Sequence, residues 1–139
     1  MSAIGIIFLS AFQIAAANPT AAPADVATLT QMADAMNESL PRMRNDDLRL
    51  EKIVVGPGFS WTYRGTFVNH DYSDALVRSF HRNTVPYVTK AMCNLYAASA
   101  DFAGRGLVTR FIYVDRNGKL VGDLTLTGES CNNKRLKTE

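Results

Sequence analysis

FSWTYRGTFV, residues 59–68, alternates bulky apolar side chains with polar ones. The apolar positions share one parity and are aromatic: Phe59, Trp61, Tyr63 and Phe67. A period of two is the period of a β-strand, because successive side chains point to opposite faces of a sheet. The stretch therefore predicts a strand with one strongly aromatic face.

This aromatic strand face (Phe59, Trp61, Tyr63 and Phe67) allows two interpretations. Facing inward, it forms core beneath covering helices and leaves Arg64 in solvent. Facing outward, it makes an apolar platform larger than a monomer usually leaves bare, and so a possible partner-binding face with Trp61 and Tyr63 as anchors. The charge of Arg64 favours the inward interpretation, because outward aromatics would press it against the helices.

A helix and a strand are predicted before this stretch. Apolar residues at helical spacing follow Asp25, a good N-cap, and predict a helix to about Leu40, where Pro41 disfavours helical geometry. Leu48–Val55 predicts a strand whose apolar parity switches near Glu51–Lys52, which indicates a β-bulge there. Residues 56–58, Gly-Pro-Gly, predict the turn into the aromatic strand.

Two helical regions are predicted after it. Asp71 or Ser73 caps the first. Residues 83–84, Asn-Thr, interrupt the pattern, and Pro86 is comfortable only in a first helical turn. We therefore expect Thr84 to be the N-cap of a new helix over Val85 to about Ala97.

The last predicted element is a hairpin of strands 107–114 and 120–127 around the turn Asp-Arg-Asn-Gly, residues 115–118. A two-residue Asn-Gly turn would pair Phe111 with Leu124. A three-residue turn with a left-handed Gly118 would pair Val114 with Leu120, and would group Ile112 and Val114 with the leucines instead. The sequence Asp-x-Asn-Gly favours the second register.

The element order is thus helix, hairpin, helix, hairpin. This order predicts an α+β fold with a single antiparallel sheet of about four strands and helices packed on one face.

The N-terminus predicts export. Residues 3–17 are apolar and uncharged, yet too short to cross a bilayer comfortably, and small residues follow them. We expect residues 1–24 to be a signal peptide and Pro/Ala-rich spacer, with cleavage after Ala17 or Ala24 and no stable membrane anchor afterwards. Residues 25–131 then form a single domain, and 132–139 a basic flexible tail.

The chain contains two cysteines, Cys93 and Cys131. In an oxidising compartment an even pair in a small domain indicates a disulfide. The expected location is therefore periplasmic or secreted.

Composition and motifs argue against several function classes. The formal charge of +2 is small and evenly spread, whereas nucleic-acid binding wants a concentrated basic face. Neither histidine, His70 or His81, has a second ligand at zinc spacing, and no hydrolase, zincin or phosphate-loop motif occurs. No metal, cofactor or catalytic residue is expected.

Several turns and both cysteines resemble those of small exported, disulfide-containing proteins of Gram-negative bacteria, whose function is uncharacterised. The resemblance covers about residues 24–131 and rests on these segments: Asn37–Pro41, Gly56–Gly58 before the aromatic strand, Cys93, Phe111–Tyr113, Asn117–Gly118 and Cys131. It implies an envelope location and the disulfide, and implies no activity.

The sequence therefore predicts a small periplasmic or secreted binding module without catalytic activity. An envelope accessory, an inhibitor or an immunity-type protein would fit, with a protein partner or a second copy of the chain as its target. The alternative is a small hydrolase with a site built from His70, His81 and carboxylates, which requires a pocket joining these groups.

Overall fold

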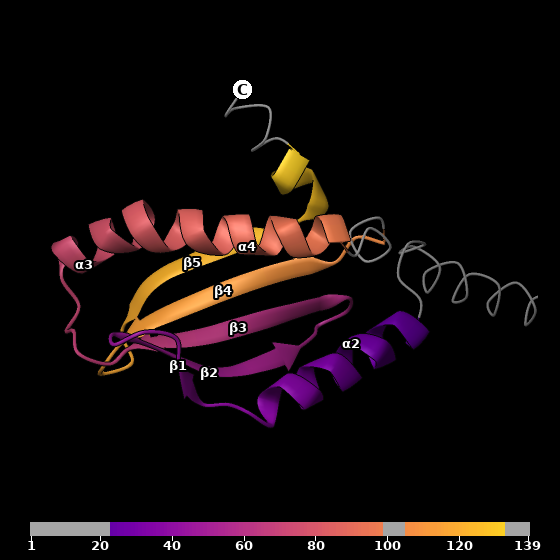
Figure 1. Cartoon of the computed structure of the whole chain (residues 1–139), viewed down its shortest axis with the longest axis horizontal. Coiled ribbons are helices and arrows are strands. Elements are labelled where there is room, and N and C mark those ends of the chain that lie inside the picture. The colour runs from indigo at the N-terminus through magenta and orange to yellow at the C-terminus, as the bar shows by residue number, and fades with distance from the viewer. Residues whose placement is uncertain (1–22, 99–104, 133–139) are drawn as a thin grey trace, which may run out of the picture.

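The computed structural model describes residues 23–98 and 105–132 of the chain. The expected signal segment lies outside the described residues apart from Pro23 and Ala24, and so does the expected tail apart from Asn132. The described part holds a five-stranded sheet and helices that border it (Figure 1). Its elements are α2 (Pro23–Asn37), β1 (Arg42–Met43), β2 (Leu48–Val55), β3 (Ser60–Phe67), α3 (Asp74–Ser79), the π-helix η1 (Phe80–Thr84), α4 (Val85–Ala98), β4 (Val108–Asp115) and β5 (Leu120–Leu126).

The sheet is mixed, with strand order β1-β2-β3-β4-β5. β3 and β4 run parallel, from the pair Ser60–Val108 to the pair Phe67–Asp115, and the other neighbours are antiparallel. The expected all-antiparallel sheet of about four strands is therefore wrong in two details. The helices between β3 and β4 carry the chain back along the sheet, which is the crossover that a parallel pair requires. The extra strand, β1, has two residues and leaves no periodic signal in the sequence.

The aromatic strand face points toward the helices, as the position of Arg64 indicated. Trp61 is 1% exposed, and Phe59 and Phe67 are also buried, in one core cluster with residues from α2, η1 and α4. Arg64 is exposed on the opposite, polar face of the sheet. Burial of these large rings contributes to the apolar stabilisation of the fold.

α2 protects the open edge of β2. The Asn37 side chain donates to the Ile53 carbonyl and accepts the Ile53 N–H, both at 2.8 Å. The short strand β1 pairs with Arg49 and Leu50 of β2. At Ile53, beyond the end of β1, the Asn37 side chain makes the hydrogen bonds that a neighbouring strand would otherwise make. The bulge expected near Glu51–Lys52 is confirmed by the register shift between Leu50 and Lys52.

The helices after β3 form one continuous run rather than two. The Ser73 hydroxyl caps α3 by accepting the Leu76 N–H at 3.0 Å. At Thr84 the expected new N-cap is absent, because η1 continues directly into α4 and the Val85 N–H bonds to the Phe80 carbonyl. Pro86 has no N–H to offer the preceding turn, and a wider π turn accommodates that loss without ending the helix.

The β4–β5 hairpin combines both expected registers. Gly118 is left-handed (φ 87°) and Val114 pairs with Leu120, as the three-residue turn predicts. A bulge between Tyr113 and Val114 then shifts the register, so Phe111 pairs with Leu124. Val114 therefore pairs with Leu120 as expected, but the expected grouping of Ile112 with the leucines is wrong, because beyond the bulge Phe111 and not Ile112 shares a face with Leu124.

Asp115 holds this turn in place. Its side chain accepts the N–H groups of Asn117, Lys119 and Tyr72, each at 2.8 Å. Burial opposes ionisation of this carboxyl, but the three backbone donors outweigh it and hold its pKa below the ordinary range. The carboxylate thus ties the segment before α3 to the β4–β5 turn.

The expected disulfide joins Cys93 of α4 to Cys131, in the helical turn at residues 128–132 that follows β5. The Cα atoms lie 5.4 Å apart, well within the range of unstrained disulfides. The bond fastens one end of the long helix to the last described segment.

Candidate functional site

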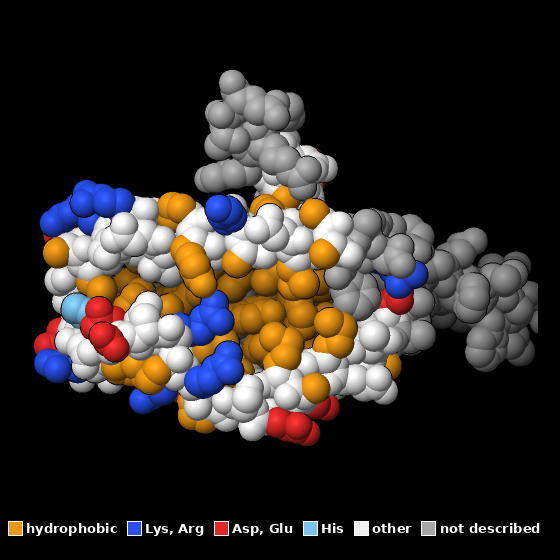
Figure 2. All heavy atoms as spheres, in the orientation of Figure 1, with side chains coloured by type: hydrophobic (Ala, Val, Ile, Leu, Met, Phe, Trp, Pro, Cys, Tyr) orange, Lys and Arg blue, Asp and Glu red, His pale blue; other side chains and the backbone are white. Residues whose placement is uncertain are grey.

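A groove of about 770 Å³ opens on the aromatic side of the sheet, between α2 and α4. Figure 2 shows it as an apolar hollow between the two helices, with basic side chains beside it. Residues from α2, β1, the three strands β2–β4 and α4 line it. We refer to this feature as the interhelix groove.

The floor of the interhelix groove is a row across three strands. Ile53, Tyr63 and Phe111 are register partners on β2, β3 and β4. The rings of Tyr63 and Phe111 are tilted against each other with centroids 5.1 Å apart. The strand pairing beneath holds these three side chains next to one another on one face of the sheet.

Exposed apolar side chains gather on the walls. Within the described residues seven large hydrophobic side chains are exposed. Four of the seven line the interhelix groove: Met36, Met43, Tyr87 and Leu95. Tyr87, on α4, is 61% exposed. Single exposed apolar residues are ordinary on a protein surface, but a contiguous set around a hollow is typical of a binding surface.

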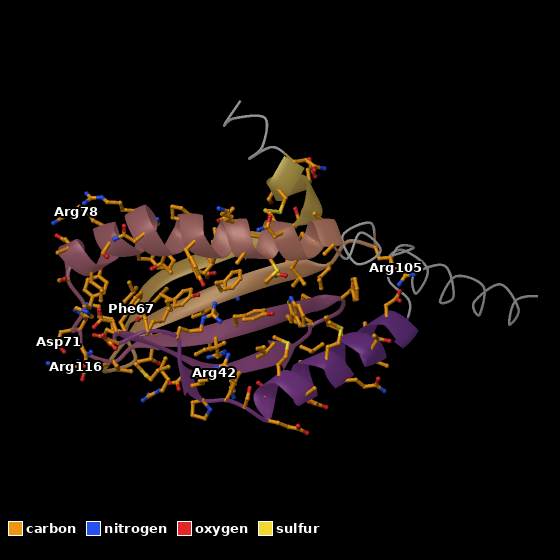
Figure 3. All side chains as sticks on the ribbon, in the orientation of Figure 1. Arg42, Phe67, Asp71, Arg78, Arg105 and Arg116 are labelled. Carbon is orange, nitrogen blue, oxygen red and sulfur yellow. A yellow bond between two sulfur atoms is a disulfide. The ribbon has the colours of Figure 1, made fainter. Side chains whose placement is uncertain are left out.

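Two arginines supply the charge of the groove. Arg42 and Arg44 flank Met43 on the β1 side, and Figure 3 labels Arg42. The Arg44 guanidinium donates to the Tyr87 hydroxyl at 3.3 Å, so this contact joins the β1 side to α4. No Asp or Glu is among the described residues that line the groove.

Two phenols of the groove stay neutral at physiological pH. Burial raises the pKa of Tyr63 and of Tyr113 to about 12, although the nearby Arg44 charge opposes the shift. The electrostatic character of the groove therefore comes from Arg42 and Arg44 and is positive.

The sequence-predicted candidates fall in different places. Of the aromatic strand face only Tyr63 lines the interhelix groove, whereas Phe59, Trp61 and Phe67 are buried. A partner could therefore contact Tyr63 but could not reach the other three without displacing core.

The two histidines do not share a pocket. His70 lies 3.4 Å from Asp47 in a second hollow of about 570 Å³, and both side chains are largely in solvent. The Asn69 amide holds the pKa of Asp47 below its usual range, with His70 contributing less. Ser73 lines the same hollow, but its oxygen already accepts the Leu76 N–H. His81 does not line this hollow and stands edge-on to Phe80.

The described residues hold neither a cluster of metal ligands nor a membrane-spanning helix. No three His, Cys, Asp or Glu side chains in residues 23–98 and 105–132 are grouped so as to hold a metal ion. None of the helices in these ranges is long and apolar enough to cross a membrane.

Comparison with known proteins places the fold. No protein-family profile and no curated protein matches the chain by sequence. A Pseudomonas aeruginosa protein described as secreted has 14% identity and a TM-score of 0.58, over 77% of this chain and 92% of that one. The pilotin EpsS of the Vibrio vulnificus type 2 secretion system has 14% identity and a TM-score of 0.51, over 77% of this chain and 91% of that one.

The likeness is one of fold. At these identities it extends to the arrangement of sheet and helices, and the chemistry of the groove has to be argued from this chain's own residues.

Sequence reasoning missed Arg42, Met43, Arg44 and Tyr87. A signal did exist for the first three, since Arg-Met-Arg directly follows Pro41 and places an apolar side chain between two cations outside any periodic element. Nothing in the sequence indicated that this segment would lie across from α4.

Proposed function

We propose that this protein is an exported, non-catalytic binding module of the bacterial envelope that holds a segment of a protein partner in the interhelix groove. The observation that carries the proposal is the concentration of exposed apolar side chains there. Solvation of such a surface is costly, and a partner that covers it recovers the hydrophobic free energy.

The groove has the build of a binding site. Its floor rests on paired strands, whereas its walls carry the exposed side chains of Met36 and Met43. Methionine is unbranched and adaptable, and is favoured at surfaces that mould themselves to a bound peptide. A floor on paired strands with adaptable walls suits recognition of a side-chain pattern.

Export and an envelope location are supported by three independent features. The N-terminal sequence has the length and the small-residue ending of a signal peptide. The disulfide requires an oxidising compartment to persist. The structural neighbours include a protein described as secreted and a secretion-system pilotin.

Site-specific photo-crosslinking in the native host tests this proposal. A benzophenone amino acid replaces Tyr87, on the groove wall, and in a matched control replaces Thr125, an exposed residue of β5 that pairs with Arg110. We expect the Tyr87 position to form an adduct with one envelope protein, mapped to a single peptide by mass spectrometry, and the Thr125 position to form none. Equal labelling from both positions would contradict the assignment of the groove.

A further inference from the structure

We propose that the segment bound in the interhelix groove is an amphipathic α-helix of the partner protein, with acidic side chains that pair with Arg42 and Arg44. This inference rests on the proposed function and adds the shape and the charge of the ligand. Two separate observations carry it, one electrostatic and one geometric.

The electrostatic observation is that, of the described arginines without a carboxylate partner, Arg42 and Arg44 line the groove, whereas Arg64, Arg78 and Arg82 do not. Four arginines have carboxylate partners at 2.5–2.9 Å: Arg49, Arg105, Arg110 and Arg116, paired with Glu51, Asp25, Asp123 and Asp71. Figure 3 shows Arg116 beside Asp71 in this way. Within residues 23–98 and 105–132, Arg42 and Arg44 have no such ion pair.

The two cations are also adjacent to the apolar surface rather than directed away from it. Both line the groove, and the Arg44 charge is felt by the phenols of Tyr63 and Tyr113 on the groove's sheet side. The hydrogen bond of its guanidinium to Tyr87 is long and exposed, so a carboxylate can replace it at little cost. A ligand with an apolar face and carboxylates beside it would cover the apolar surface of the groove and pair with the two arginines.

The geometric observation is that the groove follows one face of α4. α2 packs on β2, while α4 and the helical segments before it contact β5, so the helices lie toward opposite edges of the sheet (Figure 1). Tyr87, Ala91 and Leu95 line the groove at a spacing of four residues, which extends about 12 Å along the axis of α4. A bound helix would lie along these turns and against Tyr63, because Ile53 and Phe111 of the floor are already buried.

An extended peptide would gain less from the same surface. β-strand addition needs an open sheet edge, and the groove lies over the face of the sheet instead. A helix satisfies its own backbone hydrogen bonds, so it can lie on an apolar floor without unpaired polar groups.

Binding to designed peptides tests the inference with purified protein recovered from the envelope fraction. The probe is a fluorescein-labelled peptide of about 18 residues, long enough to form a helix, with a leucine stripe flanked by glutamates. Matched peptides carry glutamine or lysine at the glutamate positions. Affinity is measured by fluorescence anisotropy at low and at raised salt.

We expect the glutamate peptide to bind best and the lysine peptide worst. The double variant Arg42→Ala/Arg44→Ala should weaken the glutamate peptide roughly tenfold at low salt, as expected for two rim ion pairs, and leave the glutamine peptide nearly unchanged. Raised salt should reduce the difference. Arg64→Ala, which removes an exposed arginine from the other face, is the control and should change nothing.

The converse variant, Arg42→Glu/Arg44→Glu, should reverse the order and favour the lysine peptide. Because the peptide series is also measured on the unaltered protein, the inference stays testable even if a variant misfolds. Equal affinity for glutamate and lysine peptides would overturn it.

Other occupants give distinct results. If oleate saturates the groove while none of the peptides binds, the ligand is an anionic amphiphile and the inference fails. If intact mass shows that the recovered protein retains residues 1–22, and the glutamate peptide binds only after these residues are removed, the chain's own N-terminal segment is the occupant, which also overturns it. If Tyr87 still crosslinks to an envelope protein although peptide charge has no effect, the proposed function stands and only the acidic-helix inference falls.

Discussion

Trp61 donates its indole N–H to the Thr109 hydroxyl oxygen at 2.8 Å, and the two residues are register partners across the parallel pair β3–β4. The Tyr96 hydroxyl, from α4, lies 2.7 Å from the same oxygen and donates to the Leu107 carbonyl at 3.1 Å. All three side chains are buried. This network ties α4 to the two central strands at the end of the sheet beyond the interhelix groove.

Thr109→Val should destabilise the protein by about 1–3 kcal/mol, because the replacement has the same shape but leaves the buried Trp61 N–H without an acceptor. Tyr96 suffers less, since it keeps the Leu107 carbonyl. Urea unfolding followed by tryptophan fluorescence measures the change. Thr109→Ser keeps the hydroxyl and should lose less than Thr109→Val, and the opposite order would show that the methyl group, not the hydrogen bond, matters here.

Gly122 is required because the Phe80 ring packs directly over it. A Cβ at this position would collide with the ring atoms of Phe80, which is buried in the core (1% exposed). Gly122→Ala should therefore cost about 1–3 kcal/mol through overpacking. Thermal unfolding of the single variant and of Gly122→Ala/Phe80→Leu checks the cause: the smaller side chain should recover part of the loss. If Gly122→Ala/Phe80→Leu loses as much stability as Gly122→Ala and Phe80→Leu lose singly when added together, the overpacking explanation is contradicted.

Much of the fold could be predicted from local pattern, because its strands and helices have clear periods. The aromatic strand, the bulge near Glu51 and the left-handed Gly118 all follow from residue type and spacing. The parallel pairing of β3 and β4 could not be predicted in the same way. Alternation determines which face of a strand is buried, but it carries no information on the direction of the neighbouring strand.

The candidate site depended on distant parts of the chain meeting. Arg44 and Tyr87 are 43 positions apart and come together only because the crossover helix returns over the sheet. The register of the last hairpin depended on a bulge beside Tyr113, which a turn sequence does not encode. Burial of Phe59, Trp61 and Phe67 removed them from the candidate partner surface, while Tyr63 of the same strand stayed accessible.

Removal of the disulfide should lower stability substantially without changing the fold. Loop-closure entropy over the separation of 38 residues corresponds to about 4 kcal/mol at room temperature. Cys93→Ala/Cys131→Ala should unfold at a lower urea concentration, and reductant should shift the unaltered protein in the same direction but leave the double variant unaffected. An unaltered midpoint after complete reduction would show that the described helices and strands hold together without the bond.

Alkaline titration probes the phenols of the interhelix groove. Burial raises the pKa of Tyr63 and Tyr113 from the ordinary value of 10 to about 12, so the folded protein holds these protons more tightly than the unfolded chain does. Their contribution to stability is complete below the unfolded value and is lost as the pH rises through the folded value.

Phenolate absorbance should therefore show Tyr63 and Tyr113 ionising late, near pH 12 or together with unfolding. Tyr63→Phe should remove one late phenol. A helix seated on the groove floor would cover Tyr63 further and delay its ionisation. Ionisation of Tyr63 near the ordinary value of 10 in the folded protein would contradict the burial of the floor.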